Sequence, residues 1–339
     1  MARKRRSLEN APSSEENSKE ENIYFEETSL EYFPSGCTVL DCALGGGWVK
    51  DRFINIYGQS GSGKTLLLIE ATINFLKKYP DNHMRYVETE AAFDEEYAYK
   101  LGVPKERFSL ETDIYTVEDL HDDAIAFSEK NPGGLYIIDS WDALSDKAEL
   151  GRKIDENSMG AAKAKKLSET FRRMNSKMSK AGVTFMSVSQ IRAKIGVTYG
   201  RKYDRAGGYA IQFYGSQIVV INEKEKIKKV IDKITRTIGI VSEIKVEKNR
   251  AGMPFRDCLV PIYFGYGIDN LEAGLMWLEE NGADTVFDEL GISKTGYGRY
   301  LTEWRRTGNP ELEKKVDELV RREWNRIEQG FAIGRSKYS

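Results

Sequence analysis

The sequence predicts an α/β protein with a mostly parallel central sheet flanked by helices, followed by a small, mostly helical C-terminal domain. From Phe53 onward, short apolar runs rich in aromatic and β-branched residues alternate with longer segments of helical periodicity. This alternation is typical of buried parallel strands whose connecting helices cover both faces of the sheet. With 339 residues, of which 40% are hydrophobic and 31% charged, the chain is large and apolar enough to bury a full core.

Residues 1–33 are expected to form an acidic N-terminal extension. They open with a basic run at residues 1–6 and then carry eight glutamates against one lysine, Lys19. Such a composition buries little apolar surface, so we expect a mobile arm.

Four strands and four helices are expected next, in alternation. The strands are predicted at residues 53–57, 84–88, 135–139 and 183–189, and the helices at 64–79, 94–101, 116–130 and 160–181. The last helix has a face rich in lysine and arginine opposite an apolar stripe formed by Ala164, Leu167, Phe171, Met174 and Met178. For the cationic face, contact with solvent and contact with a nucleic acid are equally good interpretations.

The remainder of the chain changes from strands to helices. Residues 218–263 are predicted to form further strands, with a charged hairpin at residues 222–229, and the chain after Gly267 is mostly helical. We therefore expect a core domain over residues 34–268 and a small helical C-terminal domain over residues 269–339.

Composition excludes several classes of protein. No apolar run reaches the roughly 18 residues of a membrane-spanning helix, and no secretory signal follows the first basic residues. Cys37, Cys42 and Cys258 form no CxxC pair, which excludes a thiolate zinc site and a disulfide scaffold and fits the reducing cytoplasm. The two histidines, His83 and His121, are too few for a His-rich metal centre. Because the net charge is −2, any surface for nucleic acid must be local.

The strongest local signal is a full match to the phosphate-binding pattern GxxxxGK(S/T). It consists of Gly58, Gln59, Ser60, Gly61, Ser62, Gly63, Lys64 and Thr65. The match lies directly between a predicted strand and a predicted helix, where backbone N–H groups and the helix dipole can surround phosphates. We expect Lys64 to reach the β- and γ-phosphates of ATP and Thr65 to hold Mg²⁺.

Carboxylates follow two other predicted strands. Asp139 ends the run LYIID, at the edge where open α/β sheets bind ligands, and is expected to hold Mg²⁺ together with Thr65. Glu88 and Glu90 end another strand, and alternation along it would put both on one face. Hydrolysis needs one carboxylate to orient or deprotonate water, and the residues alone leave both glutamates as candidates.

Several segments together resemble the RecA recombinase family of bacterial proteins and their phage relatives. They occur in the family's order at residues 33–47, 56–65, 86–103, 137–144, 189–200, 207–216 and 245–255, and a weaker likeness continues at 308–320. The resemblance implies a RecA-like P-loop ATPase core that uses ATP and Mg²⁺. It selects Glu90 as the catalytic glutamate and puts Asp94 and Tyr97 near the adenine. It also identifies Gln190 as the residue that senses the γ-phosphate and relays its presence to a DNA-binding loop.

The resemblance further implies contacts between the subunits of a helical filament. Lys248 and Arg250 match a pair of cations that reach the γ-phosphate of a neighbouring protomer, and Phe213 matches a residue packed at the same boundary. A cation supplied by a neighbour makes hydrolysis depend on assembly. The family's bacterial members begin with a basic helix and end with an acidic tail, whereas this arm is acidic and the last ten residues carry no acid. These departures suit a phage or otherwise divergent member.

Two loops of such proteins hold DNA along the filament axis. The first corresponds to residues 151–160 and the second to residues 191–208. Basic, aromatic and glycine residues suit contacts with the phosphate backbone and stacking on bases. The expected DNA-binding residues are Met159, Arg192, Lys194, Tyr199, Arg201, Lys202, Tyr203, Arg205, Gly207 and Gly208.

In function, the resemblance implies an ATP-dependent recombinase that forms a helical filament on single-stranded DNA and exchanges strands with homologous double-stranded DNA. DNA would stimulate its hydrolysis of ATP to ADP and phosphate, and its location would be cytoplasmic. Loader or single-strand-binding proteins are further partners whose identity stays open. Two alternatives also stay open: a nucleotide-switched DNA scaffold without strand exchange, and a ring-forming helicase or motor of related fold.

Overall fold

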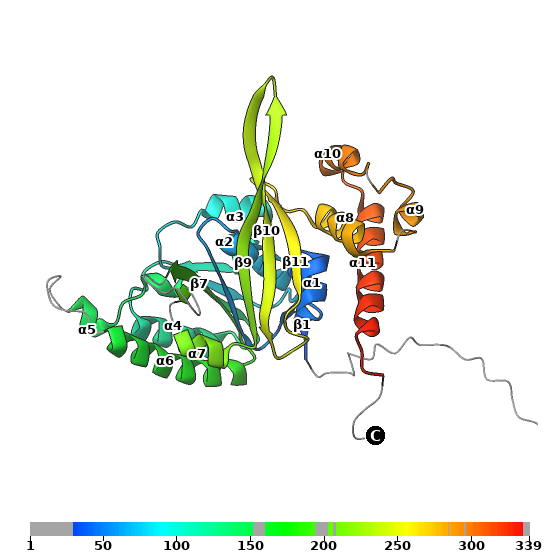
Figure 1. Ribbon diagram of the computed structural model, residues 1–339. Coiled ribbons are helices and arrows are strands. Elements are labelled where there is room, and N and C mark those ends of the chain that lie inside the picture. The colour runs from blue at the N-terminus through cyan, green and yellow to red at the C-terminus, as the bar shows by residue number, and fades with distance from the viewer. Residues whose placement is uncertain are drawn as a thin grey trace, which may run out of the picture.

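The computed structural model describes residues 30–151, 160–193, 203–205, 208–283, 285–294 and 296–334. Within these ranges a large, mostly parallel sheet is flanked by helices, and a helical part follows it (Figure 1). The described strands form a ten-stranded sheet in the spatial order β12-β11-β10-β9-β3-β7-β6-β4-β5, with β8 paired to β7. The fold class predicted from the sequence is confirmed.

The four predicted parallel strands and the four predicted helices lie close to their expected positions. A further strand at residues 108–111 and short helices at residues 105–107, 141–143 and 147–150 were not predicted. The strands are β3 (Phe53–Gly58), β4 (Met84–Glu88), β5 (Phe108–Glu111), β6 (Leu135–Asp139) and β7 (Thr184–Ala193). The helices between them are α2 (Lys64–Lys78), α3 (Glu95–Leu101), η1 (Lys105–Arg107), α4 (Val117–Lys130), η2 (Trp141–Ala143), α5 (Lys147–Leu150) and α6 (Gly160–Lys180). Only β7 is clearly longer than predicted, because residues 191–193 continue it by pairing with β8 (Tyr203–Arg205).

Helices cover both faces of these strands, as the alternation predicts. On one face α2 and α1 (Thr38–Leu44) share an apolar cluster with the sheet, and on the other α4, α6 and α7 (Gly208–Tyr214) form a second cluster. In the second cluster Phe171 of α6 lies against Phe53 and Trp141, with ring centroids 5.0 and 4.4 Å away. The apolar stripe predicted for α6 is buried at Leu167, Phe171, Met174 and Met178.

The second half of the sheet is antiparallel and contains a long hairpin. It consists of β9 (Gln217–Ile231), β10 (Ile234–Asn249), β11 (Asp257–Tyr263) and β12 (Gly267–Ile268). The hairpin of β9 and β10 projects beyond the sheet (Figure 1). The expected hairpin at residues 222–229 is wrong in position, since these residues lie inside β9. The turn is formed by Asp232 and Lys233, both at positive φ, because Ile231 pairs with Ile234 and leaves two residues to reverse the chain.

The folded core begins before the expected boundary at residue 34. Residues Tyr32–Phe33 form β1, which pairs with β2 (Trp48–Val49), and Phe33 is completely buried. The hydroxyl of Tyr32 donates a hydrogen bond to the carbonyl of Ala251, far along the chain. These two aromatic residues therefore belong to the core and not to the acidic extension.

The C-terminal part is helical, as expected, and packs tightly on the core. It contains α8 (Asn270–Asn281), α9 (Val286–Leu290), α10 (Gly298–Thr307) and α11 (Pro310–Gly330). Gly274 of α8 allows α11 to approach closely, since a Cβ there would come within 2.6 Å of Val316. Leu271, Leu275 and Val320 belong to the same apolar cluster as α1 and α2, so the two parts share one hydrophobic core. In the described ranges, no helix combines the length and the apolar character needed to span a bilayer.

Candidate active site

The phosphate loop lies at the carboxyl end of β3, directly before α2, as predicted. Its backbone requires glycine at two places. Gly63, the residue before α2, has a φ of 98°, and a Cβ at Gly58 would come within 1.9 Å of the carbonyl oxygen of Ile221 on β9. The loop is braced from β10, because the buried hydroxyl of Ser242 donates to the carbonyl of Ser62 at 2.9 Å. The loop is therefore held in shape by its own sequence and by two neighbouring strands.

Lys64 is the cation of this loop. Its Nζ donates to the carbonyl oxygens of Gly58 and Gln59 at 3.2 and 2.7 Å, so the ammonium lies within the loop. Burial lowers the pKa of Lys64, and the carboxylates of Asp139 and Glu90 oppose this effect. A cation that is partly removed from water interacts strongly with a phosphate, because little solvent screens the pair.

Thr65 and Asp139 are brought together as the expected Mg²⁺ ligands. The Thr65 hydroxyl donates to Oδ2 of Asp139 at 2.7 Å, and the Tyr86 hydroxyl donates to the same oxygen at 2.9 Å. Burial raises the pKa of Asp139, and the hydrogen bonds from these two hydroxyls oppose the rise.

The hydroxyl of Thr65 and the carboxylate of Asp139 are suitable ligands for a magnesium ion. The described residues contain no group of three or more histidine, cysteine or acidic side chains that could hold a metal by themselves. Mg²⁺ commonly takes only one or two protein oxygens and completes its shell with phosphate oxygens and water. A hydroxyl and a carboxylate beside a phosphate loop meet that requirement.

Glu88 and Glu90 have clearly different surroundings. The buried carboxylate of Glu88 accepts hydrogen bonds from the backbone N–H groups of Glu90, Ala91 and Ala92, at 2.8, 2.8 and 3.2 Å. These bonds turn the chain, so β4 ends at Glu88. The expectation that strand alternation puts both glutamates on one face is therefore wrong. Glu90 lies past the strand and is exposed.

Glu90 is joined directly to Gln190. Its Oε1 accepts hydrogen bonds from Nε2 of Gln190 at 2.9 Å and from the Ser140 hydroxyl at 2.5 Å. Gln190 pairs with Gly58 across β7 and β3, so it stands at the same edge of the sheet as the phosphate loop. The structure thus brings Lys64, Glu90 and Gln190 to one edge.

Asp94 and Tyr97, expected near the adenine, belong to α3. Asp94 is the N-cap of this helix, and its carboxylate accepts the backbone N–H of Tyr97 at 2.9 Å. The Tyr97 ring is partly buried beside Ile69 and Ile73 of α2, and burial raises its pKa. Both residues therefore have structural roles at the start of α3, and their contact with a nucleotide stays a prediction.

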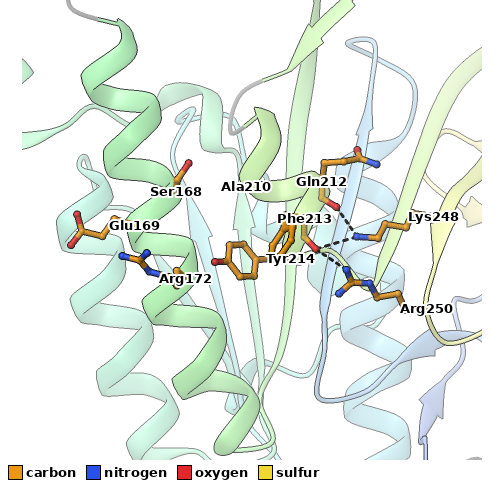
Figure 2. A pocket seen from close by; sticks show the side chains of 9 residues that line it. All are labelled: Ser168, Glu169, Arg172, Ala210, Gln212, Phe213, Tyr214, Lys248 and Arg250. Atoms are coloured by element: carbon orange, nitrogen blue, oxygen red, sulfur yellow. Dashed lines mark hydrogen bonds between the residues drawn. The ribbon is translucent and has the colours of Figure 1, made fainter.

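Phe213, Lys248 and Arg250, which are expected at a subunit boundary, lie close together in the structure. Figure 2 shows the two cations pointing at the end of α7, where Lys248 donates to the carbonyls of Gln212 and Phe213, at 2.6 and 3.2 Å, and Arg250 donates to that of Phe213 at 3.1 Å. The ring of Phe213 is 66% exposed. Burial and the nearby Arg250 lower the pKa of Lys248. A groove of about 650 Å³ separates these residues from Ser168, Glu169 and Arg172 of α6.

These cations lie at the opposite end of the sheet from the phosphate loop of the same chain. Through Ile218 of β9, Lys248 lies at the level of Asn55 in β3. The backbone N–H of Arg250 is bonded to the carbonyl of Ser216, whose own N–H is bonded to the carbonyl of Phe53, so Arg250 lies at the level of Phe53. Phe53 is the first residue of β3 and Gly58 the last. At a rise of about 3.3 Å per residue, the five steps between them separate Arg250 from the loop by roughly 17 Å along the strand.

Most of the expected DNA-binding residues fall outside the described ranges. Met159, Lys194, Tyr199, Arg201, Lys202 and Gly207 belong to this group. The described backbone places Arg192 on β7 opposite Asp204, places Arg205 opposite Ile191, and places Tyr203 opposite Ala193. Gly208 is the first residue of α7. The second expected loop thus leaves and rejoins the sheet through a short antiparallel pair that begins directly after Gln190.

Two polar residues of this site, Ser140 and Asp142, were not predicted from the sequence. Ser140 donates to Glu90, and Oδ2 of Asp142 accepts the backbone N–H of Gln190 at 2.7 Å. Ser140 directly follows the buried run that ends at Asp139, and Asp142 lies in the short helix after it. Polar side chains just past the carboxyl end of a parallel strand often face the ligand-binding edge, and this signal was present in the sequence.

Comparisons with known proteins agree with this geometry. A family model described as RecA N-terminal domain matches residues 21–269, a range that includes the phosphate loop, Gln190, Lys248 and Arg250. Protein RecA of Acholeplasma laidlawii is 32% identical over 300 residues, which are 86% of this chain and 87% of that protein. Those of Synechococcus sp. (strain CC9311) and Parasynechococcus marenigrum are each 32% identical, over 299 and 301 residues, covering 86% of this chain and 75% and 76% of theirs.

Proposed function

Because the chain belongs to the RecA family, we propose that it is a DNA-dependent ATPase and recombinase. In this proposal, protomers loaded with ATP and Mg²⁺ assemble into a helical filament on single-stranded DNA. The filament then pairs that strand with homologous double-stranded DNA and exchanges strands.

The single observation that carries the proposal is the hydrogen bond from Gln190 to Glu90. Gln190 stands where β7 continues toward residues 194–202, which we expect to bind DNA. Glu90 is the carboxylate that we expect to activate water. One hydrogen bond therefore joins the beginning of the DNA segment to the catalytic group, and a change at one end alters the other. Such a link is what hydrolysis stimulated by DNA requires.

In the proposed reaction, water attacks the γ-phosphorus of ATP and Glu90 accepts a proton from that water. The bond between the γ-phosphorus and the β–γ bridging oxygen breaks, and ADP leaves. The hydrogen bonds that Glu90 accepts from Ser140 and Gln190 both reach Oε1, which leaves Oε2 to face the water. Lys64 balances negative charge on the β- and γ-phosphates. Mg²⁺, when bound by Thr65 and Asp139, supplies further neutralisation of the phosphates.

Lys248 and Arg250 are proposed to act on the nucleotide of a neighbouring protomer. Their positions support this. The backbone of Arg250 lies about 17 Å along the strand from the loop of its own chain, and the Lys248 ammonium is directed to carbonyl oxygens at the end of α7 and not to that loop. In a head-to-tail assembly, the end of the sheet that carries Lys248 and Arg250 faces the phosphate loop of the next protomer. The exposed Phe213 ring supplies apolar contact beside the cations. Hydrolysis would then need at least two subunits.

The proposal is tested by negative-stain electron microscopy of the protein with single-stranded DNA, with and without a non-hydrolysable ATP analogue. We expect helical filaments that require both DNA and nucleotide. Closed rings would favour the helicase or motor alternative. An assay of strand exchange on homologous duplex DNA then separates a recombinase from a scaffold, since a scaffold forms filaments without exchanging strands.

A further inference from the structure

Four residues at the edge of the sheet are joined in a closed ring of hydrogen bonds. The Ser140 hydroxyl and Nε2 of Gln190 both donate to Oε1 of Glu90, at 2.5 and 2.9 Å. The backbone N–H of Gln190 donates to Oδ2 of Asp142 at 2.7 Å, and the backbone N–H of Asp142 closes the ring with a long contact of 3.4 Å to the Ser140 hydroxyl. Three segments that are distant in sequence meet in this ring.

Asp142 supplies a hydrogen-bond acceptor to β7 beyond the point where the pairing with β6 ends. The pairing of β6 with β7 runs from Leu135 to Ile138, which lies opposite Ser187, whereas β7 continues past Gln190. Gln190 keeps its partner on the other side, Gly58 of β3. On the side of β6 its N–H meets no further strand and is bonded to the Asp142 carboxylate instead. A hydrogen bond to a charged acceptor is stronger than the usual backbone bond, so the anchor is firm.

We propose that Asp142 is a positioning residue for hydrolysis: by holding the main chain of Gln190, it keeps the Gln190 amide within reach of Glu90. Because the main chain of Gln190 is held at this point, a movement of the segment that follows β7 changes the contact between Gln190 and Glu90. Without the hydrogen bond to Asp142, the end of the strand could move without changing that contact. The inference rests on the proposed function, because it assigns to Asp142 the coupling between DNA and hydrolysis. Ser140 completes the arrangement by holding the same carboxylate oxygen from the other side.

The Asp142 carboxylate has a second possible role, the effect of its charge on Lys64, which the test has to separate from its hydrogen bond to Gln190. The charge of Asp142 also acts on Lys64, since it is among the carboxylates that oppose the lowering of the Lys64 pKa by burial. If charge were the important property, an asparagine would be as harmful as an alanine. If the hydrogen bond is important, the side-chain oxygen of asparagine can accept it and restore much of the coupling.

The test compares Asp142→Ala, Asp142→Asn and a matched control, Asp146→Ala. Asp146 is a buried N-cap four residues away whose carboxylate accepts the backbone N–H of Glu149 at 2.7 Å, so the control also loses one such bond but lies outside the ring. Steady-state hydrolysis is measured with and without single-stranded DNA, together with KM for ATP. For Asp142→Ala we expect the stimulation by DNA to fall roughly tenfold with KM within about twofold of wild type. Asp142→Asn should retain most of the stimulation, and Asp146→Ala all of it.

A double-mutant cycle tests whether Asp142 acts through Gln190. In a Gln190→Ala background, adding Asp142→Ala should change the rate less than about twofold, because the residue that it positions is already gone. Equal losses in both backgrounds, or an Asp142→Asn protein as impaired as Asp142→Ala, would overturn the inference.

A readout that is independent of activity keeps the two proposals apart. Hydrogen exchange of the Gln190 amide should be at least roughly tenfold faster in Asp142→Ala and unchanged in Asp146→Ala. Unchanged exchange in Asp142→Ala would overturn the inference even if hydrolysis fell. A wild-type protein without DNA-stimulated hydrolysis would refute the proposed function instead, and exchange would still decide whether Asp142 anchors Gln190.

Discussion

The side-chain amide of Gln190 donates a hydrogen bond to the carboxylate of Glu90 at 2.9 Å, although the two residues are 100 positions apart in the sequence. Glu90 follows β4 and Gln190 lies on β7, with β6 between these strands in the sheet. The parallel order of the strands therefore brings together a carboxylate suited to activate water and an amide suited to sense a phosphate.

Exchanging each of the two glutamates for glutamine should have different effects. Glu90→Gln should slow hydrolysis by about 10²- to 10⁴-fold, because an amide cannot accept the proton of water, while the melting temperature stays near that of wild type. Glu88→Gln should lower the free energy of unfolding by about 2–3 kcal/mol, because the buried carboxylate loses its charge-assisted bonds to backbone N–H groups. Hydrolysis rates and thermal melts of both variants make the comparison. An active Glu90→Gln protein beside a stable but inactive Glu88→Gln protein would reverse the assignment.

Lys64→Ala should weaken ATP binding by roughly a hundredfold, corresponding to about 3 kcal/mol for the lost charge-assisted contacts with the phosphates. Lys77→Ala is a matched control, since Lys77 is an exposed lysine in the last turn of the same helix. Titration with a fluorescent ATP analogue measures both affinities. Wild-type affinity in Lys64→Ala would contradict the assignment of the phosphate loop.

Removing three charges from the second expected DNA loop should weaken the salt dependence of binding. In Arg201→Ala/Lys202→Ala/Arg205→Ala, the slope of log K against log salt should fall by about 2, because each phosphate contact on single-stranded DNA contributes about 0.7. The control neutralises three exposed lysines of the hairpin, Lys226, Lys228 and Lys229. Fluorescence anisotropy with a labelled oligonucleotide at several salt concentrations gives the slopes. An unchanged slope in the loop variant would place the DNA elsewhere, with the cationic face of α6 as the next surface to test.

Asp41 should make stability depend on pH. It is only 4% exposed, its Oδ1 accepts the N–H of Ser35 at 2.7 Å, and it faces Arg321, at 3.7 Å, and Asp317. Burial raises the pKa of Asp41 to about 6, so the folded protein holds a proton that the unfolded chain releases near pH 4. Its contribution is therefore present at low pH and is lost as the pH rises through about 6.

Asp41→Asn should remove this dependence, because the amide keeps an acceptor for Ser35 and does not ionise. From about pH 3 to 7, the free energy of unfolding of wild type should fall by about 3 kcal/mol relative to the variant. Urea denaturation of both proteins across this range measures the difference. If the free energy of unfolding changed with pH in the same way in both proteins, the raised pKa of Asp41 would be contradicted.

The features that the sequence predicted correctly depend on local requirements. The phosphate loop is recognisable because Gly58 and Gly63 meet steric and backbone demands within a few residues of each other. The buried strands and the stripe on α6 are recognisable because apolar spacing fixes which face is buried. In the site, Lys64, Thr65 and Asp139 lie where pattern and strand order predicted them.

The features that were missed depend on contacts between distant segments. The end of β4 is fixed by the capture of three N–H groups by Glu88, which strand periodicity does not reveal. The turn of the long hairpin is fixed by the pairing of Ile231 with Ile234, whereas the charged residues before it suggested an earlier turn. Asp142 acts on a strand that is adjacent only in the folded sheet. Its place just past a buried strand marks it as a residue of the ligand-binding edge but does not reveal that it holds the backbone of Gln190.

Mixing two variants, each expected to be impaired in hydrolysis, decides whether Lys248 and Arg250 complete the site of a neighbouring protomer. Lys248→Ala/Arg250→Ala retains Glu90 and its phosphate loop, and Glu90→Gln retains both cations. Where the first protein supplies Glu90 and the second supplies the cations, one complete composite site forms.

The measurement is DNA-stimulated ATP hydrolysis of each variant alone and of an equimolar mixture, with co-assembly on DNA shown by labelled protomers. We predict that neither variant alone hydrolyses ATP at a rate near that of wild type and that the mixture recovers a substantial part of the wild-type rate. The cations also bind carbonyls at the end of α7 within their own chain. Co-assembled filaments without recovered hydrolysis would mean that this internal contact is their function, and the account of a shared site would be contradicted.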